Sequence, residues 1–230
     1  MYRGQSAWDE LIEVLKLSSR YATDPEADRL LRTEVAETYA EKLGDLEHGV
    51  EAWQAVLDLD PNALAPLDAL ESLHRRREDF MAVQEILLRR ADAVDGDEAR
   101  IAVYMRLSQL AEIDREAPEE AVDFMRSVLE IDSAHEDANA QLDRLLRGLE
   151  RWHDVVELYQ IRAEICAVQG DDAGELRLLA QAAELWEGQL DNPDEAAEML
   201  EKILVRDPNS VAALTRLAKI YESASDWERC

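Results

Sequence analysis

The sequence predicts an all-α protein made of stacked helical repeats, and two markers that recur in step carry this prediction. The first is an aromatic residue, which recurs at spacings of 72, 72 and 75 residues as Trp8, Phe80, Trp152 and Trp227. The second is an apolar segment that leads into an Asp, and its copies begin at Val56, Val128 and Ile203. A fixed period of this kind is typical of stacked units, each of which buries its apolar face against its neighbours.

Helical periodicity runs along the whole chain. Ala, Leu, Glu and Arg, which are good helix formers, dominate the composition, and apolar residues recur three and four positions apart. Twelve helices are expected, at residues 7–20, 26–42, 46–58, 63–75, 79–94, 98–114, 118–130, 135–148, 151–168, 172–189, 194–205 and 210–223. Because every connection is short, consecutive helices should lie antiparallel.

Polar residues, prolines and glycines mark the expected helix ends. Asp24-Pro25 and Asn192-Pro193 each place a capping side chain before a proline at the first helical position. Ser133 has the spacing of a capping box with Glu136. Glycine tolerates a left-handed backbone, so helices should end at Gly44, Gly96, Gly148 and Gly170.

Residues 37–45 and 49–61, with the sequences ETYAEKLGD and GVEAWQAVLDLDP, resemble a tetratricopeptide repeat. The later copies match at the same offsets, at Leu107, Leu110, Ala111, Ala121, Val122, Met125, Val128 and Leu129, and at Ala183, Trp186, Ala196, Ala197, Leu200, Ile203, Leu204 and Asp207-Pro208. The resemblance implies a right-handed α-solenoid of antiparallel helix hairpins. Small residues should lie where two helices touch, at Gly49, Ala121 and Ala196, while Trp53 and Leu200 should fill the gap to the next unit.

The stretches between these motifs, residues 62–95 and 134–168, diverge from the family pattern. The repeating unit is therefore expected to be a pair of hairpins, one typical and one divergent. A related helical repeat, of the half-a-tetratricopeptide or Sel1-like kind, is an open alternative.

The domain organisation expected from these copies is a single array over residues 1–230. The copies run over 8–79, 80–151 and 152–226, and a further copy starts at 227–230. Residues 7–20 resemble the second helix of a hairpin whose first helix is missing. The chain is therefore expected to be a segment of a longer array.

The chain is strongly acidic, with a formal net charge of −27. The excess is spread over all three copies, which argues against nucleic-acid binding because that requires clustered Lys and Arg. It favours solubility first and a basic partner second. No apolar stretch is long enough to span a membrane, so no membrane insertion is expected.

No residue set in the sequence predicts catalysis, a cofactor or a metal. His153 and Glu157 have a metal-ligand spacing but lack a third ligand, so a surface role is favoured. The basic clusters 75–77 and 89–90 are expected to counter local acids and helix dipoles. The sequence therefore predicts no catalytic, cofactor-binding or metal-binding residues, and it does not identify the residues that bind a partner.

The resemblance implies a non-catalytic scaffold that receives a peptide or protein on a concave groove lined by first helices. Acidic and amide side chains are expected there, at Glu34, Glu37, Glu41, Gln109, Glu112, Glu184 and Glu187. A cytoplasmic location is expected. Two alternatives stay open: a structural spacer or self-association module of a larger protein, and a regulatory array attached to an enzyme domain.

Overall fold

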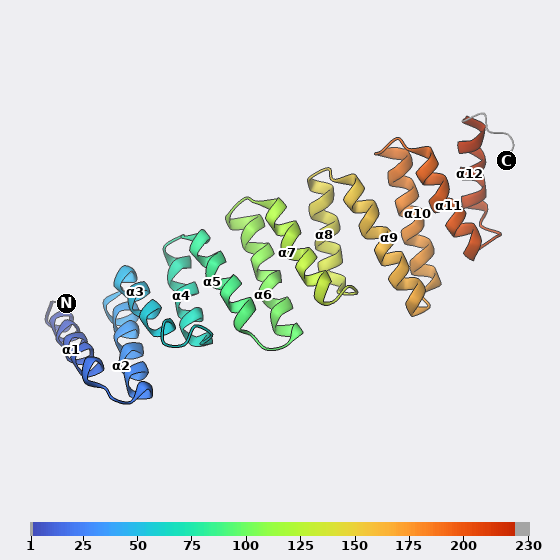
Figure 1. Cartoon of the computed structure of the whole chain (residues 1–230). Helices are drawn as coiled ribbons and strands as arrows, with labels where there is room; N and C mark the ends of the chain where they lie inside the picture. Colours follow the sequence, from blue (N-terminus) through green and yellow to red (C-terminus); the bar gives the residue numbers. More distant parts are fainter. Residues whose placement is uncertain (1, 224–230) are drawn as a thin grey trace. The chain divides into compact units, whose positions relative to one another are not determined.

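The computed structural model describes residues 2–223, and every regular element among them is helical (Figure 1). The prediction of an all-α fold is confirmed. The Trp227 marker and the predicted start of a further copy at 227–230 lie outside the described residues. Contacts between Cα atoms divide the chain into two compact units, residues 1–117 and 118–230, and each is described by itself.

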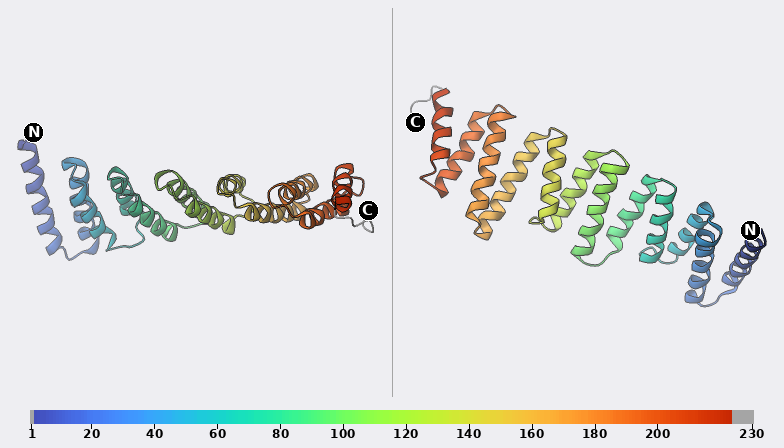
Figure 2. Two further views of the ribbon diagram at one scale, coloured as in Figure 1. Left: turned by 90° about the horizontal axis from the view of Figure 1, so that it is seen from above. Right: turned by 180° about the vertical axis from the view of Figure 1, so that it is seen from behind.

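The first unit contains six α-helices. They are α1 (Tyr2–Tyr21), α2 (Pro25–Glu37), α3 (Leu46–Leu57), α4 (Leu64–Arg76), α5 (Phe80–Ala93) and α6 (Asp97–Gln109). Two of them continue into short π-helical segments, η1 (Thr38–Leu43) after α2 and η2 (Leu110–Asp114) after α6. Successive helices lie side by side as hairpins, as α4 and α5 do in each view (Figures 1 and 2).

The second unit contains α7 (Pro118–Ile131), α8 (Glu136–Gly148), α9 (Trp152–Gln169), α10 (Asp172–Gly188), α11 (Pro193–Arg206) and α12 (Val211–Ser223). Within it, α10 packs against both α9 and α11. Most predicted helix bounds agree with these within one or two residues. The start of the first helix was wrong, because α1 begins at Tyr2 rather than near residue 7. Apolar spacing marks where a helix packs, and the backbone of α1 continues beyond that point.

The predicted α-helices at 26–42 and 98–114 were also wrong in their last turns, which are wound as the π-helical segments η1 and η2. In each of the three copies of the motif, the first helix of the hairpin (α2, α6 or α10) is followed by the same wide backbone hydrogen bond. In this bond an amide donates to the carbonyl six residues earlier. These bonds run from Asp45 to Tyr39, from Ala117 to Ala111 and from Asn192 to Trp186, at 2.9, 2.8 and 2.8 Å. They are spaced by 72 and 75 residues, so the local backbone repeats with the period of the sequence markers.

In each of these wide turns the residue just before the donating amide is left-handed, and the prediction that glycine would occupy such positions was only partly right. Gly44 has a φ of 67°, but its counterparts are Glu116 at 51° and Asp191 at 47°. Gly170 ends α9 as predicted, with a φ of 77°. Gly96 has a positive φ but precedes α6, and Gly148 is the last residue of α8, where the left-handed residue is Glu150 instead. Backbone bonds to Leu145 and Leu146 after α8 hold that turn without a glycine.

The predicted caps at Asp24 and Asn192 are confirmed, since their side chains accept from the amides of Glu26 and Glu195. The predicted capping box at Ser133 was wrong. His135 caps α8 instead, and its Nδ1 accepts from the amide of Ala138 at 3.2 Å. Ser133 lies two residues too early, and its carbonyl accepts from the buried side chain of Asn139.

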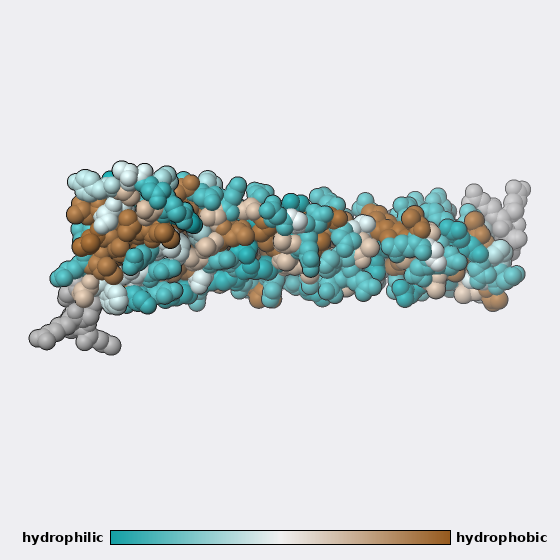
Figure 3. All heavy atoms as spheres, turned by 90° about the horizontal axis from the view of Figure 1, so that it is seen from below, coloured by the Kyte–Doolittle hydropathy of each residue, from teal (hydrophilic) through white to brown (hydrophobic). Residues whose placement is uncertain are grey.

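The surface drawn in Figure 3 is mostly hydrophilic, as the charge of the chain predicts. Apolar side chains gather at the end of that view where the first helices lie (Figure 3). No helix among residues 2–223 is long and apolar enough to cross a membrane.

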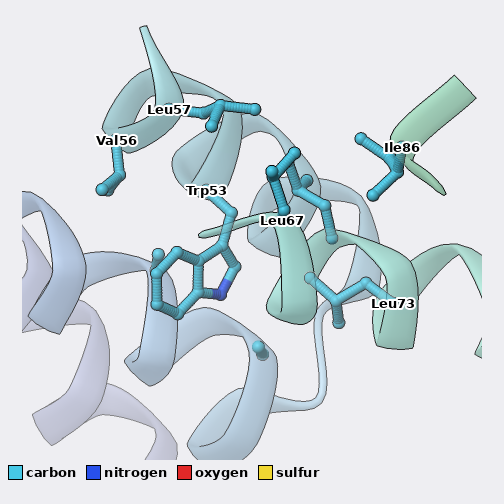
Figure 4. Close-up of a cluster of buried hydrophobic side chains, with 9 residues drawn as sticks. Trp53, Val56, Leu57, Leu67, Leu73 and Ile86 are labelled. Carbon is cyan, nitrogen blue, oxygen red and sulfur yellow. The ribbon is translucent and has the colours of Figure 1, made fainter. Parts of the chain in front are cut away.

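The core of the first unit forms where α3 meets its neighbours. Trp53, Val56 and Leu57 of α3 pack with Leu67 and Leu73 of α4, and Ile86 of α5 joins them (Figure 4). The predicted gap-filling role of Trp53 is confirmed, because only 7% of it is exposed. Leu200 is buried in the second unit, as are Ala121 and Ala196 at the positions that correspond to Gly49.

Candidate functional site

The first unit has an open cleft of about 340 Å³ that is walled by α1, α2 and α3. We call it the α1–α3 cleft. Val35 and Ala52 supply the apolar part of its lining. Val35 is buried in a cluster with Ile12 and Leu15 of α1, and Ala52 is half-buried beside that cluster. Its other lining residues are Lys16, Ser19, Arg20, Arg32, Tyr39, His48, Glu51 and Ala55. The cleft therefore combines an apolar surface with several polar side chains.

Three cations line this cleft in a chain whose net charge is −27. The ammonium of Lys16 donates to the hydroxyl of Tyr39 at 3.0 Å and lies 5.1 Å from the centre of its ring. Arg20 is exposed, and within residues 7–223 neither Lys16 nor Arg20 forms an ion pair. These two charges are therefore available to an anionic ligand.

The guanidinium of Arg32 is held in place by the carboxylate of Asp28. Its Nε donates to Asp28 Oδ1 at 3.1 Å, and its Nη2 lies 3.0 Å from Asp28 Oδ2. Ser19 also donates to Asp28. The hydrogen bonds from Arg32 and Ser19 lower the pKa of Asp28 below its usual range, so this carboxylate remains charged and fixes the guanidinium. A held guanidinium loses less side-chain entropy when it binds a ligand.

A short polar chain forms another side of the cleft. The rings of Tyr39 and His48 stack with centroids 5.2 Å apart and planes at 19°. His48 Nδ1 lies 2.8 Å from Asp45 Oδ2, and Asp45 Oδ1 accepts from the amide of His48 at 3.1 Å. The bond from the His48 amide leads the interactions that lower the pKa of Asp45. Since an ionised carboxylate only accepts, the Nδ1 atom of His48 carries the proton in this pair.

The second unit has a cleft of about 390 Å³ at the corresponding place, between α9, α10 and α11. The positions of Lys16, Arg20 and Arg32 are taken there by Gln160, Glu164 and Leu179. Its own cations are Lys202 and Arg206, and Arg206 Nε donates to Glu175 Oε1 at 3.1 Å. The repeated backbone therefore forms a similar cleft in each unit. Of these two clefts, only the α1–α3 cleft has cations on both its first and its second helix.

The acidic and amide residues predicted for the first helices lie mostly on the surface. Glu34, Glu37, Glu41, Gln109, Glu184 and Glu187 are exposed, and Glu112 is half-buried. Arg216 of α12 forms a 2.9 Å ion pair with Glu187. Glu34, Glu37, Glu41, Gln109 and Glu112 belong to the first unit, and Glu184 and Glu187 belong to the second.

One arginine of each basic cluster, Arg75 and Arg90, pairs with a local acid, as predicted for the clusters. Arg75 Nε lies 3.1 Å from Oε1 of buried Glu71, which also accepts from Arg106. Arg90 pairs with Asp68. His153 does not approach a metal-like set, and its ring meets that of Trp186 edge-on at 5.4 Å. No three His, Cys, Asp or Glu side chains converge on a cation-sized site within residues 2–223.

Sequence reasoning missed the α1–α3 cleft because its cations lie at separate positions on two helices. The signal was present in the repeat alignment, where Lys16 and Arg20 stand opposite Gln160 and Glu164. Cys166 of α9 is half-buried, and burial and the nearby Asp171 raise the pKa of its thiol.

No known family model matches the chain, and no curated protein matches it in sequence. Among solved structures, it is similar to YrrB, described as a TPR protein with an unusual peptide-binding site. The identity is 16% and the TM-score 0.38, over 82% of this chain and 91% of that one. A tetratricopeptide repeat protein from Parabacteroides merdae is similar at 14% identity and a TM-score of 0.42, over 95% and 94%.

A TPR repeat-containing protein from Cytophaga hutchinsonii is similar at 18% identity and a TM-score of 0.39, over 93% of this chain and 95% of that one. These solved structures, to which the chain is similar, belong to tetratricopeptide-repeat proteins, the family whose motif the sequence resembles.

Proposed function

We propose that the chain is a non-catalytic protein-interaction scaffold whose α1–α3 cleft binds a peptide segment through a carboxylate. One observation carries the proposal. In a chain with net charge −27, Lys16 and Arg20 stand without acidic partners among the described residues, beside an apolar surface and a pre-positioned Arg32. Arg and Lys are the side chains that proteins use to bind carboxylates.

The same charges set the character of the ligand. An acidic side chain of the ligand would meet Lys16, Arg20 and Arg32, and a neighbouring apolar side chain would cover Val35 and Ala52. A peptide with many acids would be repelled by the rest of the chain. The favoured ligand is therefore a segment with one carboxylate between apolar residues.

A second candidate is a basic segment bound on the exposed acidic side of α2. Glu34, Glu37 and Glu41 follow one another at helical spacing and are all exposed. Only Glu41 has a basic neighbour in contact, with Lys42 Nζ at 4.0 Å. An acidic, concave binding surface belongs to this second candidate, as does a basic partner.

The proposal includes a cytoplasmic location, where a thiol such as that of Cys166 stays reduced. A structural spacer or self-association module, and a regulatory array beside an enzyme domain, are the competing hypotheses. The spacer or self-association hypothesis predicts that the α1–α3 cleft has no peptide preference.

A displayed library of random peptides, selected in parallel on three forms of the chain, tests the proposal. The forms are the wild type, the cleft variant Lys16→Glu/Arg20→Glu, and the control Lys42→Glu/Lys219→Glu, which changes the net charge equally outside the cleft. The proposal predicts that the wild type and the control enrich peptides with one Asp or Glu beside apolar residues. The cleft variant should lose this enrichment.

Enrichment of Lys- and Arg-rich peptides by all three forms would favour the acidic side of α2 instead. Equal enrichment of acidic peptides by the cleft variant and the wild type would contradict the α1–α3 cleft as the site.

A further inference from the structure

Three arginines of the first unit line one open hollow between α4 and α6. The hollow has a volume of about 420 Å³, and its lining residues are Asp68, Glu71, Ser72, Arg75, Arg76 and Arg106. We call it the α4–α6 arginine site. Arg90 of α5 stands beside it, paired with Asp68. Guanidiniums thus gather at one place in a chain whose net charge is −27.

A buried carboxylate holds two of these arginines side by side. Glu71 Oε1 accepts from Arg75 Nε at 3.1 Å, and it also accepts from Arg106 Nη2. The side chain of Glu71 is only 6% exposed, whereas those of Arg75 and Arg106 are 39% and 43% exposed. Each guanidinium has five N–H donors, and Glu71 takes one from each. The two arginines are therefore held in place and keep donors for a ligand.

The carboxylates near this site do not neutralise all of its arginines. A third carboxylate is more distant, with Asp114 Oδ2 at 3.9 Å from Arg75 Nη1. Arg76 is exposed, and its side chain has no hydrogen bond or ion pair within residues 7–223. Burial lowers the pKa of Arg90, and the charge of Arg106 lowers it further. Since Arg90 and Arg106 repel one another, a bound anion would relieve that repulsion.

The ion pair at the centre of the site is common to both units. Glu71 and Arg75 correspond to Asp143 and Arg147 of the second unit, which pair at 3.1 Å. The other positions differ in the second unit, which has Gly148 in place of Arg76, Gln181 in place of Arg106 and Arg144 in place of Ser72. The repeat therefore packs without arginines at the positions of Arg76 and Arg106, and packing alone does not explain them.

We propose that the α4–α6 arginine site binds a phosphorylated side chain of a partner protein. A phosphate monoester has three terminal oxygens and about two negative charges at neutral pH, so it can accept from all three lining arginines and from the hydroxyl of Ser72. A carboxylate has two oxygens and one charge, and it matches fewer of these donors.

The charge of the whole chain restricts the ligand further. Long polyanions such as nucleic acids would be repelled by a net charge of −27. One phosphoryl group on an otherwise neutral or basic segment avoids most of this repulsion. The site is separate from the α1–α3 cleft, and the proposal does not depend on that cleft.

Three pools of short peptides test the proposal on the 230-residue chain. The flanking residues of each pool are random, and the central residue is phosphoserine, serine or glutamate. In heteronuclear NMR, the phosphoserine pool should shift the side-chain Nε signals of Arg75, Arg76 and Arg106. The glutamate pool should shift them less, and the serine pool should leave them unchanged. Equal shifts with the serine and phosphoserine pools, or shifts of other arginines only, would overturn the proposal.

Two further readings assign the signals to a source. The Nε signal of Arg32 reports on the α1–α3 cleft, so binding there is read separately. Inorganic phosphate alone should bind more weakly than the best phosphopeptide from the pool, because a peptide adds contacts around the phosphoryl group. Inorganic phosphate that binds as tightly as that phosphopeptide would show a site for the free anion, and the assignment to a protein-borne group would be wrong.

Two neighbouring arginines provide matched variants. Arg76→Gln removes a guanidinium that lines the site, and Arg77→Gln removes another exposed one that does not. Neither side chain has a partner within residues 7–223, so circular dichroism should show unchanged helicity in both variants. Arg76→Gln should weaken binding of the phosphopeptide about tenfold, because it removes charge-assisted hydrogen bonds. Arg77→Gln should weaken it less than about twofold at physiological salt. Equal losses in the two variants would show attraction by general charge, and the proposed site would be wrong.

Discussion

Gly49 of α3 lies directly against Ala40 of η1, so closely that a Cβ atom on Gly49 would stand 3.4 Å from the Cβ of Ala40. This is ordinary van der Waals contact, with no space for a larger group. The corresponding residues in the later copies, Ala121 and Ala196, are fully buried. The helix crossing is therefore built for a side chain no larger than a methyl group.

Replacing Gly49 by Ala should raise the free energy of unfolding by about 0.5–1 kcal/mol, because Ala is the better helix former and its methyl group fits. Replacing Gly49 by Leu should lower it by about 1–3 kcal/mol, because the side chain must displace Ala40. Urea denaturation followed by circular dichroism measures both. A Leu variant as stable as the Ala variant would contradict the close crossing of α3 and η1.

The hydroxyl of buried Tyr159 links two charged side chains of α8. It donates to Asp143 Oδ1 at 2.7 Å and accepts from Arg147 Nη2 at 2.6 Å. Tyr159→Phe should therefore lower the free energy of unfolding by about 1–2 kcal/mol, since it removes two charge-assisted bonds. Tyr104→Phe, at a half-buried tyrosine, is the matched control and should be neutral. Equal effects in the two variants would refute a stabilising role for the Tyr159 hydroxyl.

Stability should fall in acid partly through Asp154. Arg151 Nε donates to Asp154 at 2.7 Å, and this bond, with a second from Arg126, lowers the pKa of Asp154 below its usual range. A carboxylate with a lowered folded-state pKa contributes fully above its unfolded pKa, and its contribution is lost as pH falls through the folded pKa. Asp154→Asn should unfold more easily at neutral pH, by about 1 kcal/mol, and lose less stability on acidification. Parallel pH profiles for the variant and the wild type would argue against this role.

The thiol of Cys166 should react slowly in the folded chain. Burial raises its pKa, and the nearby carboxylate of Asp171 raises it further. Because the thiolate is the nucleophile, iodoacetamide at mildly alkaline pH should alkylate Cys166 more slowly in the folded chain than in denaturant. A Cys230→Ser background isolates this thiol. An equal or faster rate in the folded chain would show that Cys166 is not shielded in this way.

Helix positions could be predicted from the sequence because apolar spacing is a local signal. The crossing at Gly49 and the packing of Trp53 followed from the same motif. The left-handed residues Glu116 and Asp191 could not be predicted, because the wide turns that contain them impose a conformation that these side chains do not favour.

The α1–α3 cleft could not be predicted from local patterns either. Lys16 and Arg32 are sixteen residues apart, and they line one cleft only because α1 and α2 pack against α3.

The most direct test of the proposed scaffold function is a titration by heteronuclear NMR with two capped peptides, acetyl-Leu-Glu-Leu-amide and acetyl-Leu-Gln-Leu-amide. They differ only in the carboxylate. The account predicts that the Glu peptide shifts backbone amides of α1, α2 and α3 and the side-chain signal of Arg32, that the Gln peptide does so far less, and that salt weakens the difference. Shifts of equal size with both peptides, or shifts confined to helices outside the α1–α3 cleft, would contradict it.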